Sequence, residues 1–168
     1  YLKEVYIFDH NNINDNPELE LSFCTNFLVL QNNKIVPYKD RSTDLFYIGD
    51  IGGKEDYQRR DLLINKLLEN IEGNFDVRIY KNKSIISKDF MLIDEIKFSY
   101  TSEYLSLLDS IERTRQSKVV LDICKGHHIG LSFRFFECLA SETKIITNNK
   151  DIVNYDFYSA DNVFVFRS

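Results

Sequence analysis

The stretch "KVVLDICKGHHIGLSFRFFECLASETKIITN", residues 118–148, determines how the rest of the chain is interpreted. Its first six residues are nearly all apolar, as expected for a strand that is covered on both faces of a sheet. A glycine-containing loop at 123–130, a helical segment at 131–141 and an apolar strand at 143–148 follow. Strand, helix and strand in this order predict a parallel sheet.

The same alternation extends in both directions from this stretch. Further strands are expected at 4–9, 44–50, 75–81 and 162–166, with a weaker apolar run at 91–98, and further helices at 57–71, 101–114 and 150–154. The pattern predicts an α/β fold, a three-layer α/β/α Rossmann-like domain with a mainly parallel sheet of five or six strands. Residues 44–168 form this domain, and the Asn- and Asp-rich residues 1–43 are expected to be a linker that packs on it.

Besides the helix at 57–71, two helices have a clear apolar face in the sequence. In the first, Thr101 or Ser102 is a suitable N-cap, and the residues expected to be buried are Tyr104, Leu108 and Ile111. In the second, they are Leu131, Phe135 and Leu139, while Arg134 and Glu137 share a different face.

Charge and composition exclude several classes of protein. The net charge of −5 disfavours a nucleic-acid-binding protein, which usually carries a basic face. No apolar run reaches the roughly 20 residues that a membrane-spanning helix needs, and no signal peptide is recognisable. The three cysteines are widely spaced without a C-x-x-C motif, which favours reduced thiols in a cytoplasmic protein.

The histidines and cysteines near the glycine loop suggest a zinc site or a Cys/His nucleophile. Adjacent side chains of His127 and His128 diverge, and their spacing from Cys124 and Cys138 matches no usual zinc pattern. Cys138 lies on the apolar side of its helix, where a buried, inert thiol is expected. We therefore predict no metal at this stretch and three unpaired cysteines.

An anion site is the third interpretation. Ligands of doubly wound sheets bind beyond the carboxyl ends of the strands. Gly130 turns the chain there, and the N–H groups of Leu131 and Ser132 at a helix start attract phosphate, with the Ser132 hydroxyl beside them. Arg134 and Glu137 follow on the helix. The alternative, a plain turn followed by a surface ion pair, stays open.

The loop at 49–56 repeats this arrangement. Gly49 ends a strand, and Lys54, Arg59 and Arg60 supply cations, of which arginine can bind two phosphate oxygens at once. Neither a P-loop nor a G-x-G-x-x-G motif with its acidic partner is present. Two anion-binding loops at one sheet edge suit a diphosphate, although a glycine turn with solvated charges remains an alternative.

Four segments in order resemble bacterial lipopolysaccharide and capsular-polysaccharide biosynthesis proteins of the GT-B glycosyltransferase type: "DLFYIGD…RRDLL", "SEYLSLLDSIERTRQSKVVLDI", "GLSFRFFECLASETKIITNN" and "IVNYDFYSADNVFVF". The resemblance implies the C-terminal half of such an enzyme, which binds a nucleotide-sugar donor. It places the glycan or lipid-linked acceptor and any catalytic base in an N-terminal half that this chain lacks. It also implies activity without a metal or cofactor, in the cytoplasm or at the inner face of the membrane through peripheral association.

The resemblance also assigns roles to residues. Glu137 in "ECLASETKIIT" corresponds to a glutamate that holds the donor ribose, Gly130 and the following N–H groups face the diphosphate, and Arg59 or Arg60 neutralises it. The residues expected to bind the donor are Gly49, Lys54, Arg59, Arg60, His127, Gly130, Leu131, Ser132, Arg134 and Glu137. Ile129 stands where many retaining enzymes carry a second glutamate, so the stereochemistry stays open. The alternative function is a non-catalytic flavodoxin-like or receiver-like module that acts through protein partners.

Overall fold

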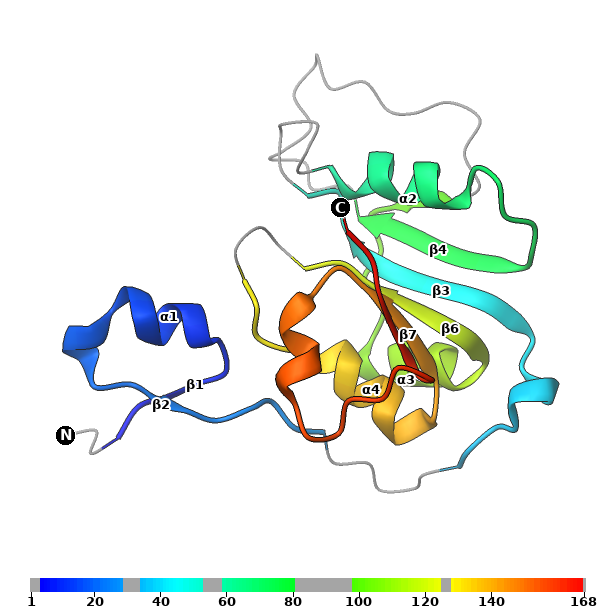
Figure 1. The fold of residues 1–168 in the computed structure, drawn as a ribbon. Coiled ribbons are helices and arrows are strands. Elements are labelled where there is room, and N and C mark those ends of the chain that lie inside the picture. The colour runs from blue at the N-terminus through cyan, green and yellow to red at the C-terminus, as the bar shows by residue number, and fades with distance from the viewer. Residues whose placement is uncertain (1–3, 29–33, 53–58, 81–97, 125–127, 168) are drawn as a thin grey trace, which may run out of the picture.

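The computed structural model describes residues 4–28, 34–52, 59–80, 98–124 and 128–167. Within them, one sheet consists of β3 (Thr43–Asp50), β4 (Phe75–Tyr80), β5 (Ser99–Thr101), β6 (Ser117–Asp122), β7 (Lys144–Thr147) and β8 (Val163–Val165). The strand order is β5-β4-β3-β6-β7-β8, and every neighbouring pair is parallel (Figure 1). The predicted α/β fold is confirmed, and the most apolar strand, β6, is central.

Helices cover both faces of this sheet (Figure 1). Helix α2 (Arg60–Leu68) packs Ile64 and Leu68 on one face, whereas α4 (Phe133–Ser141) packs Phe135 and Cys138 on the other, beside α3 (Leu107–Arg115). Alternate residues of β3 point into the two cores, as the pleat of a strand requires. None of the helices in the described ranges is long and apolar enough to cross a membrane.

The prediction for the first amphipathic helix was wrong at its start. Residues 99–101 form β5, and α3 begins only after Ser106, whose hydroxyl oxygen accepts a hydrogen bond from the N–H of Asp109. Ile111 is buried as predicted, and Thr114 is the other buried residue of α3. The side chains of Tyr104 and Leu108 are 78% and 76% exposed instead of buried.

Helix α4 also differs from its predicted face. Leu131 and Phe135 are buried as predicted, but Leu139 is 43% exposed. The buried positions of α4 include Glu137 and Cys138, because this helix contacts α3 as well as the sheet. A neighbouring helix therefore widens the buried stripe to include a charged residue.

Residues 4–28, here called the N-terminal arm, lie outside the large sheet (Figure 1). The predicted strand at 4–9 is reduced to β1 (Tyr6–Ile7), which pairs in parallel with β2 (Ser22–Phe23). Between them are α1 (His10–Asp15) and a 3-10 turn, η1 (Pro17–Leu19). A second such turn, η2 (Tyr38–Asp40), precedes β3, and η4 (Lys150–Asn154) follows β7.

Arg41 connects the start of β3 to the end of α4. Its guanidinium donates to the carbonyl oxygens of Val36, Ser117, Ser141 and Glu142 and to the hydroxyl of Thr143. The side chain is only 5% exposed. One cation thus satisfies the carbonyl groups at the C-terminal end of α4, where the helix dipole is negative.

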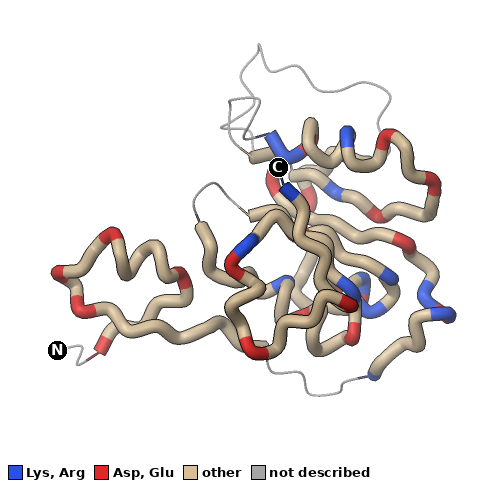
Figure 2. Tube along the Cα trace, in the orientation of Figure 1, with Lys and Arg blue, Asp and Glu red and all other residues tan. Residues whose placement is uncertain are grey.

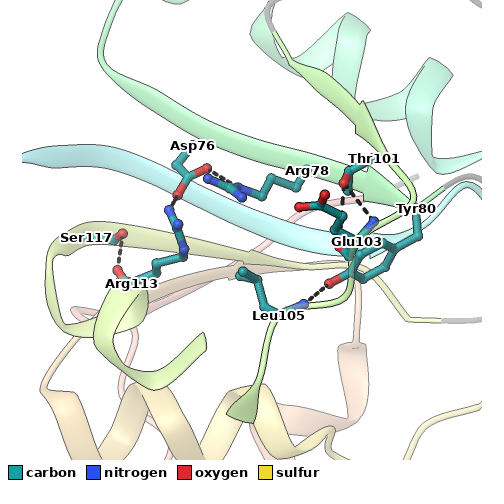
Figure 3. A network of polar contacts seen from close by, with 8 residues as sticks. All are labelled: Asp76, Arg78, Tyr80, Thr101, Glu103, Leu105, Arg113 and Ser117. Carbon is teal, nitrogen blue, oxygen red and sulfur yellow. Dashed lines mark hydrogen bonds and ion pairs between the residues drawn. The ribbon is translucent and has the colours of Figure 1, made fainter. Parts of the chain in front are cut away.

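A second polar network joins α3 to β4 (Figure 3). Asp76 forms ion pairs with Arg78 on its own strand and with Arg113 on α3. Tyr80 accepts a hydrogen bond from the N–H of Leu105 at 2.7 Å, just before α3. These contacts hold the connection between β5 and β6 against the strand beside it.

Candidate anion-binding site

The strand order creates a topological switch point between β3 and β6. Numbered along the chain from β3, the order is 3-2-1-4-5-6, which is that of the doubly wound nucleotide-binding folds. The chain winds away from β3 in one direction and from β6 in the other. Because these strands are parallel neighbours, they end at the same edge, β3 at Asp50 and β6 at Asp122.

The charges of four groups at this edge act on the hydroxyl of Tyr47. Burial raises the pKa of Tyr47 to about 12, with Arg60 and Arg134 acting to lower it and Asp50 and Asp122 acting to raise it. The hydroxyl reaches toward the end of β3, where a Cβ on Gly49 would collide with it. Gly49 lies within β3, so its lack of a side chain makes room for tyrosine instead of forming a turn.

Arg134 is the member of this group that lies on α4. It lies in the first turn of α4, and its guanidinium carbon is 5.7 Å from the centre of the Tyr47 ring. This places the cation over an aromatic face, which holds it in position without neutralising it. Its Nε is buried and, among the described residues, has no hydrogen-bond partner.

The two arginines of the preceding loop have separate roles. Arg60 pairs with the carboxylate of Asp50 at the end of β3 and lies near enough to Cys124 to affect its pKa. Arg59 instead binds Asp61 through two nitrogens, at 3.0 and 2.5 Å, and both side chains are buried. Of the two predicted phosphate ligands, the structure brings only Arg60 to the switch point. Lys54 lies outside the described residues.

The start of α4 combines predicted and unpredicted contacts. Ser132 is its N-cap residue but donates its hydroxyl to Asp122 at 2.8 Å instead of capping the helix. The side chain of Leu131 is buried, and its carbonyl oxygen accepts a hydrogen bond from Asn26 of the N-terminal arm. The N–H groups of the first turn of α4 therefore receive no cap from Ser132.

Asp9 of the N-terminal arm is a site residue that sequence reasoning missed. Its carboxylate accepts a hydrogen bond from the N–H of Ile129 at 3.2 Å and lies 3.0 Å from Nδ1 of His128. No sequence pattern links positions about 120 residues apart, so only the folded chain could reveal this contact. The carbonyl oxygen of Phe8 lies where a Cβ on Gly130 would be. His127 lies outside the described residues.

Glu137 lies between α4 and α3. It is 5% exposed and accepts a hydrogen bond from Ser110 of α3 at 3.0 Å. Burial raises its pKa, and Arg134 and the hydroxyls of Ser110 and Thr114 act against that effect. Ser110 occupies one of the two carboxylate oxygens, and the ribose role stays a prediction.

The cysteines are all free, as predicted. Cys24 is exposed, Cys124 is half-buried and Cys138 is fully buried. In the described part of the chain, no group of three or more His, Cys, Asp or Glu side chains is arranged to hold a metal ion.

Thiol reactivity should follow this burial. Burial raises the pKa of Cys124 to about 12 and that of Cys138 well above its usual value, so both stay protonated at neutral pH. We expect one fast-reacting thiol, Cys24, in a colorimetric disulfide-exchange assay at pH 8, and three after unfolding in urea. Raising the pH to 9 should not expose a second, since Cys124 remains protonated. Two fast thiols in the native protein would contradict this assignment.

A hollow lies beside β4 and β5, away from the switch point. A cavity of about 520 Å³ is lined by residues 75–78 of β4 and 98–101 around β5. Asp76 and Arg78, which line it, are already paired with each other. These two charges therefore belong to the structural network in Figure 3 that joins β4 to α3.

Comparison of the chain with known proteins adds no functional assignment. The geometry at the switch point is therefore the basis on which a function is inferred. No family model, curated protein or solved structure gives a significant match to this chain.

Proposed function

We propose that this chain is the donor-binding domain of a GT-B-type glycosyltransferase that transfers a sugar from a nucleotide-sugar to a bacterial surface glycan. The proposal is supported by a Rossmann-like sheet whose switch point gathers Arg60, Arg134 and the start of α4. It is further supported by the four sequence segments that resemble such enzymes. The observation that carries it is the buried Nε of Arg134 at a helix N-terminus, which has no hydrogen-bond partner in the part of the chain that the structure describes.

The proposed chemistry follows from the charges at this edge. A nucleotide diphosphate leaves the sugar with negative charge on its terminal phosphate. Arg134 and the uncapped N–H groups of α4 would hold that charge, and a fixed environment of this kind stabilises a leaving group without reorganising. Arg60 would have to bind the diphosphate while it keeps its ion pair with Asp50. The acceptor and a general base would come from a second domain.

Replacing Arg134 with glutamine tests this proposal. A charge-assisted hydrogen bond contributes about 1.5–3 kcal/mol, so binding of UDP, GDP or CDP should weaken about tenfold or more. Isothermal titration calorimetry of the parent and the variant measures the difference. The matched control is Arg78→Gln on β4, where arginine pairs with Asp76 away from the switch point.

Two results would count against a donor site. The parent could bind none of the three nucleoside diphosphates, or Arg134→Gln could bind them as tightly as the parent does. In either case the cation over Tyr47 is structural.

An interaction module is the second candidate function. Tyr104, Leu107 and Leu108 near the start of α3 are each more than half exposed, and clustered exposed apolar side chains are typical of partner surfaces. A protein that binds no nucleotide but loses a partner when Leu108 becomes serine would favour this module over the enzyme domain.

A further inference from the structure

The contact between the N-terminal arm and the loop before α4 centres on one carboxylate. Asp9 is 1% exposed, although it lies on a segment that is otherwise poorly covered. One of its oxygens caps α1 by accepting a hydrogen bond from the N–H of Asn11. The other oxygen faces His128 and the N–H of Ile129. The close approach of Phe8 to Gly130 brings the two backbones together at this point.

Asp9 behaves as a bound anion. Burial alone would raise its pKa, but hydrogen bonds from His128 and from the N–H groups of Asn11, Gly130 and Ile129 outweigh burial and lower it. Consecutive backbone N–H groups that converge on one carboxylate form the type of concavity that also binds phosphate. The arm therefore occupies donors beside the proposed diphosphate position.

The rest of the arm has the charge and the packing of a displaceable segment. Residues 4–28 contain five acidic residues and neither Lys nor Arg. In Figure 2 the left-hand lobe accordingly has red segments and no blue ones. Asp9 is the one arm residue that is fully buried. Tyr6 and Phe27 are 60% and 73% exposed, so little apolar burial opposes release of the arm.

We propose that the N-terminal arm is an intramolecular competitor of the ligand: Asp9 occupies the N–H group of Ile129 and its neighbours, and a diphosphate binds by displacing Asp9. This inference rests on the proposed function, because it assumes that the loop before α4 receives phosphate. A ligand that binds only the arm-released state has its apparent Kd raised by the inverse of the released fraction. The docked arm thus lowers the apparent affinity of the protein for the diphosphate.

A purely structural arm makes the opposite prediction. If Asp9 only ties the loop in place, neutralising it would loosen the loop and weaken ligand binding. If Asp9 competes with the ligand, neutralising it would strengthen binding. The sign of the change therefore decides between the two roles.

The experiment compares Asp9→Asn with Asp15→Asn, using inorganic pyrophosphate as the probe in calorimetry. Asparagine is as good an N-cap as aspartate, so α1 should persist in Asp9→Asn. Asp15 is an exposed carboxylate on the same helix and controls for general charge. We expect Asp9→Asn to bind pyrophosphate about fivefold tighter or more than the parent, corresponding to an arm released less than about one fifth of the time. Asp15→Asn should bind as the parent does.

Two further measurements keep the result interpretable. In the parent, saturating pyrophosphate should speed proteolytic cleavage within the arm. Asn26→Ala removes the hydrogen bond from the arm to Leu131 without altering Asp9, and it should also tighten pyrophosphate binding if Asp9→Asn fails to fold.

The outcomes separate this inference from the proposed function. Equal or weaker pyrophosphate binding by Asp9→Asn, with unchanged arm cleavage, overturns the competitor role. If the parent still binds nucleoside diphosphates through Arg134, the donor site survives that result. If neither protein binds pyrophosphate, the competitor role is also refuted, and failure with nucleoside diphosphates would refute the donor site separately.

Discussion

Replacing Arg41 with methionine is expected to lower the free energy of unfolding by about 3–5 kcal/mol, the cost typical of breaking a buried polar network. The variant would leave the carbonyl groups of Ser117, Ser141 and Glu142 without the donor that now satisfies them. Glu142 adopts a left-handed conformation, with φ of 52°, so this helix end already carries backbone strain. Urea denaturation measures the change.

Arg113→Met is the matched control for Arg41. Arg113 is 36% exposed and pairs with Asp76 at the surface, where such ion pairs contribute about 0–1 kcal/mol. Equal losses in the two variants would show that Arg41 does not support the end of α4. Arg41→Lys should recover little stability, because a single ammonium cannot reach carbonyl groups on three segments at once.

Replacing Arg59 with methionine is expected to cost about 3–5 kcal/mol as well, because it leaves the fully buried carboxylate of Asp61 unpaired. Asp61 also accepts a hydrogen bond from the hydroxyl of Tyr100 at 2.9 Å. This single hydrogen bond does not compensate for the loss of the Arg59 cation. The double variant Arg59→Met/Asp61→Leu should recover most of the loss, since apolar residues can replace a buried ion pair. Chemical denaturation of all three proteins gives the coupling energy.

Arg60→Met distinguishes the two adjacent arginines. Arg60 pairs with the partly exposed Asp50, so its loss should change stability less than the loss of Arg59 does. The expected consequence is weaker nucleoside-diphosphate binding.

A double variant at 59 and 61 that is as unstable as the single Arg59 variant would mean that Asp61 needs a charged partner for another reason.

The fold was predictable because it depends on local patterns. Apolar runs such as residues 118–123, separated by segments of helical periodicity, identify strands buried on both faces. Parallel pairing then follows from the length of the connections, and with it the common edge of Asp50 and Asp122. The start of α3 was less predictable, since Thr101, Ser102 and Ser106 are all acceptable N-caps and only the pairing of β5 excludes the first.

The candidate site was predictable in position but only partly in its residues. Arg134 and Arg60 could be named because glycine loops and arginines follow strand ends in the sequence. The local sequence does not show that Arg59 forms a buried ion pair with Asp61, or that α3 covers Glu137. Both outcomes depend on which side chains desolvate each other after packing.

The sequence by itself determined the α/β order, the central strand and the edge at which a ligand is sought, because these follow from periodicity and connection length. Only the tertiary structure decided which charges at that edge remain available. Asp9 reaches Ile129 and Arg41 reaches Ser141 across about 100 or more residues of chain. Such contacts form when elements pack and bury polar groups that must find partners, and a buried polar group takes whichever partner the fold brings near.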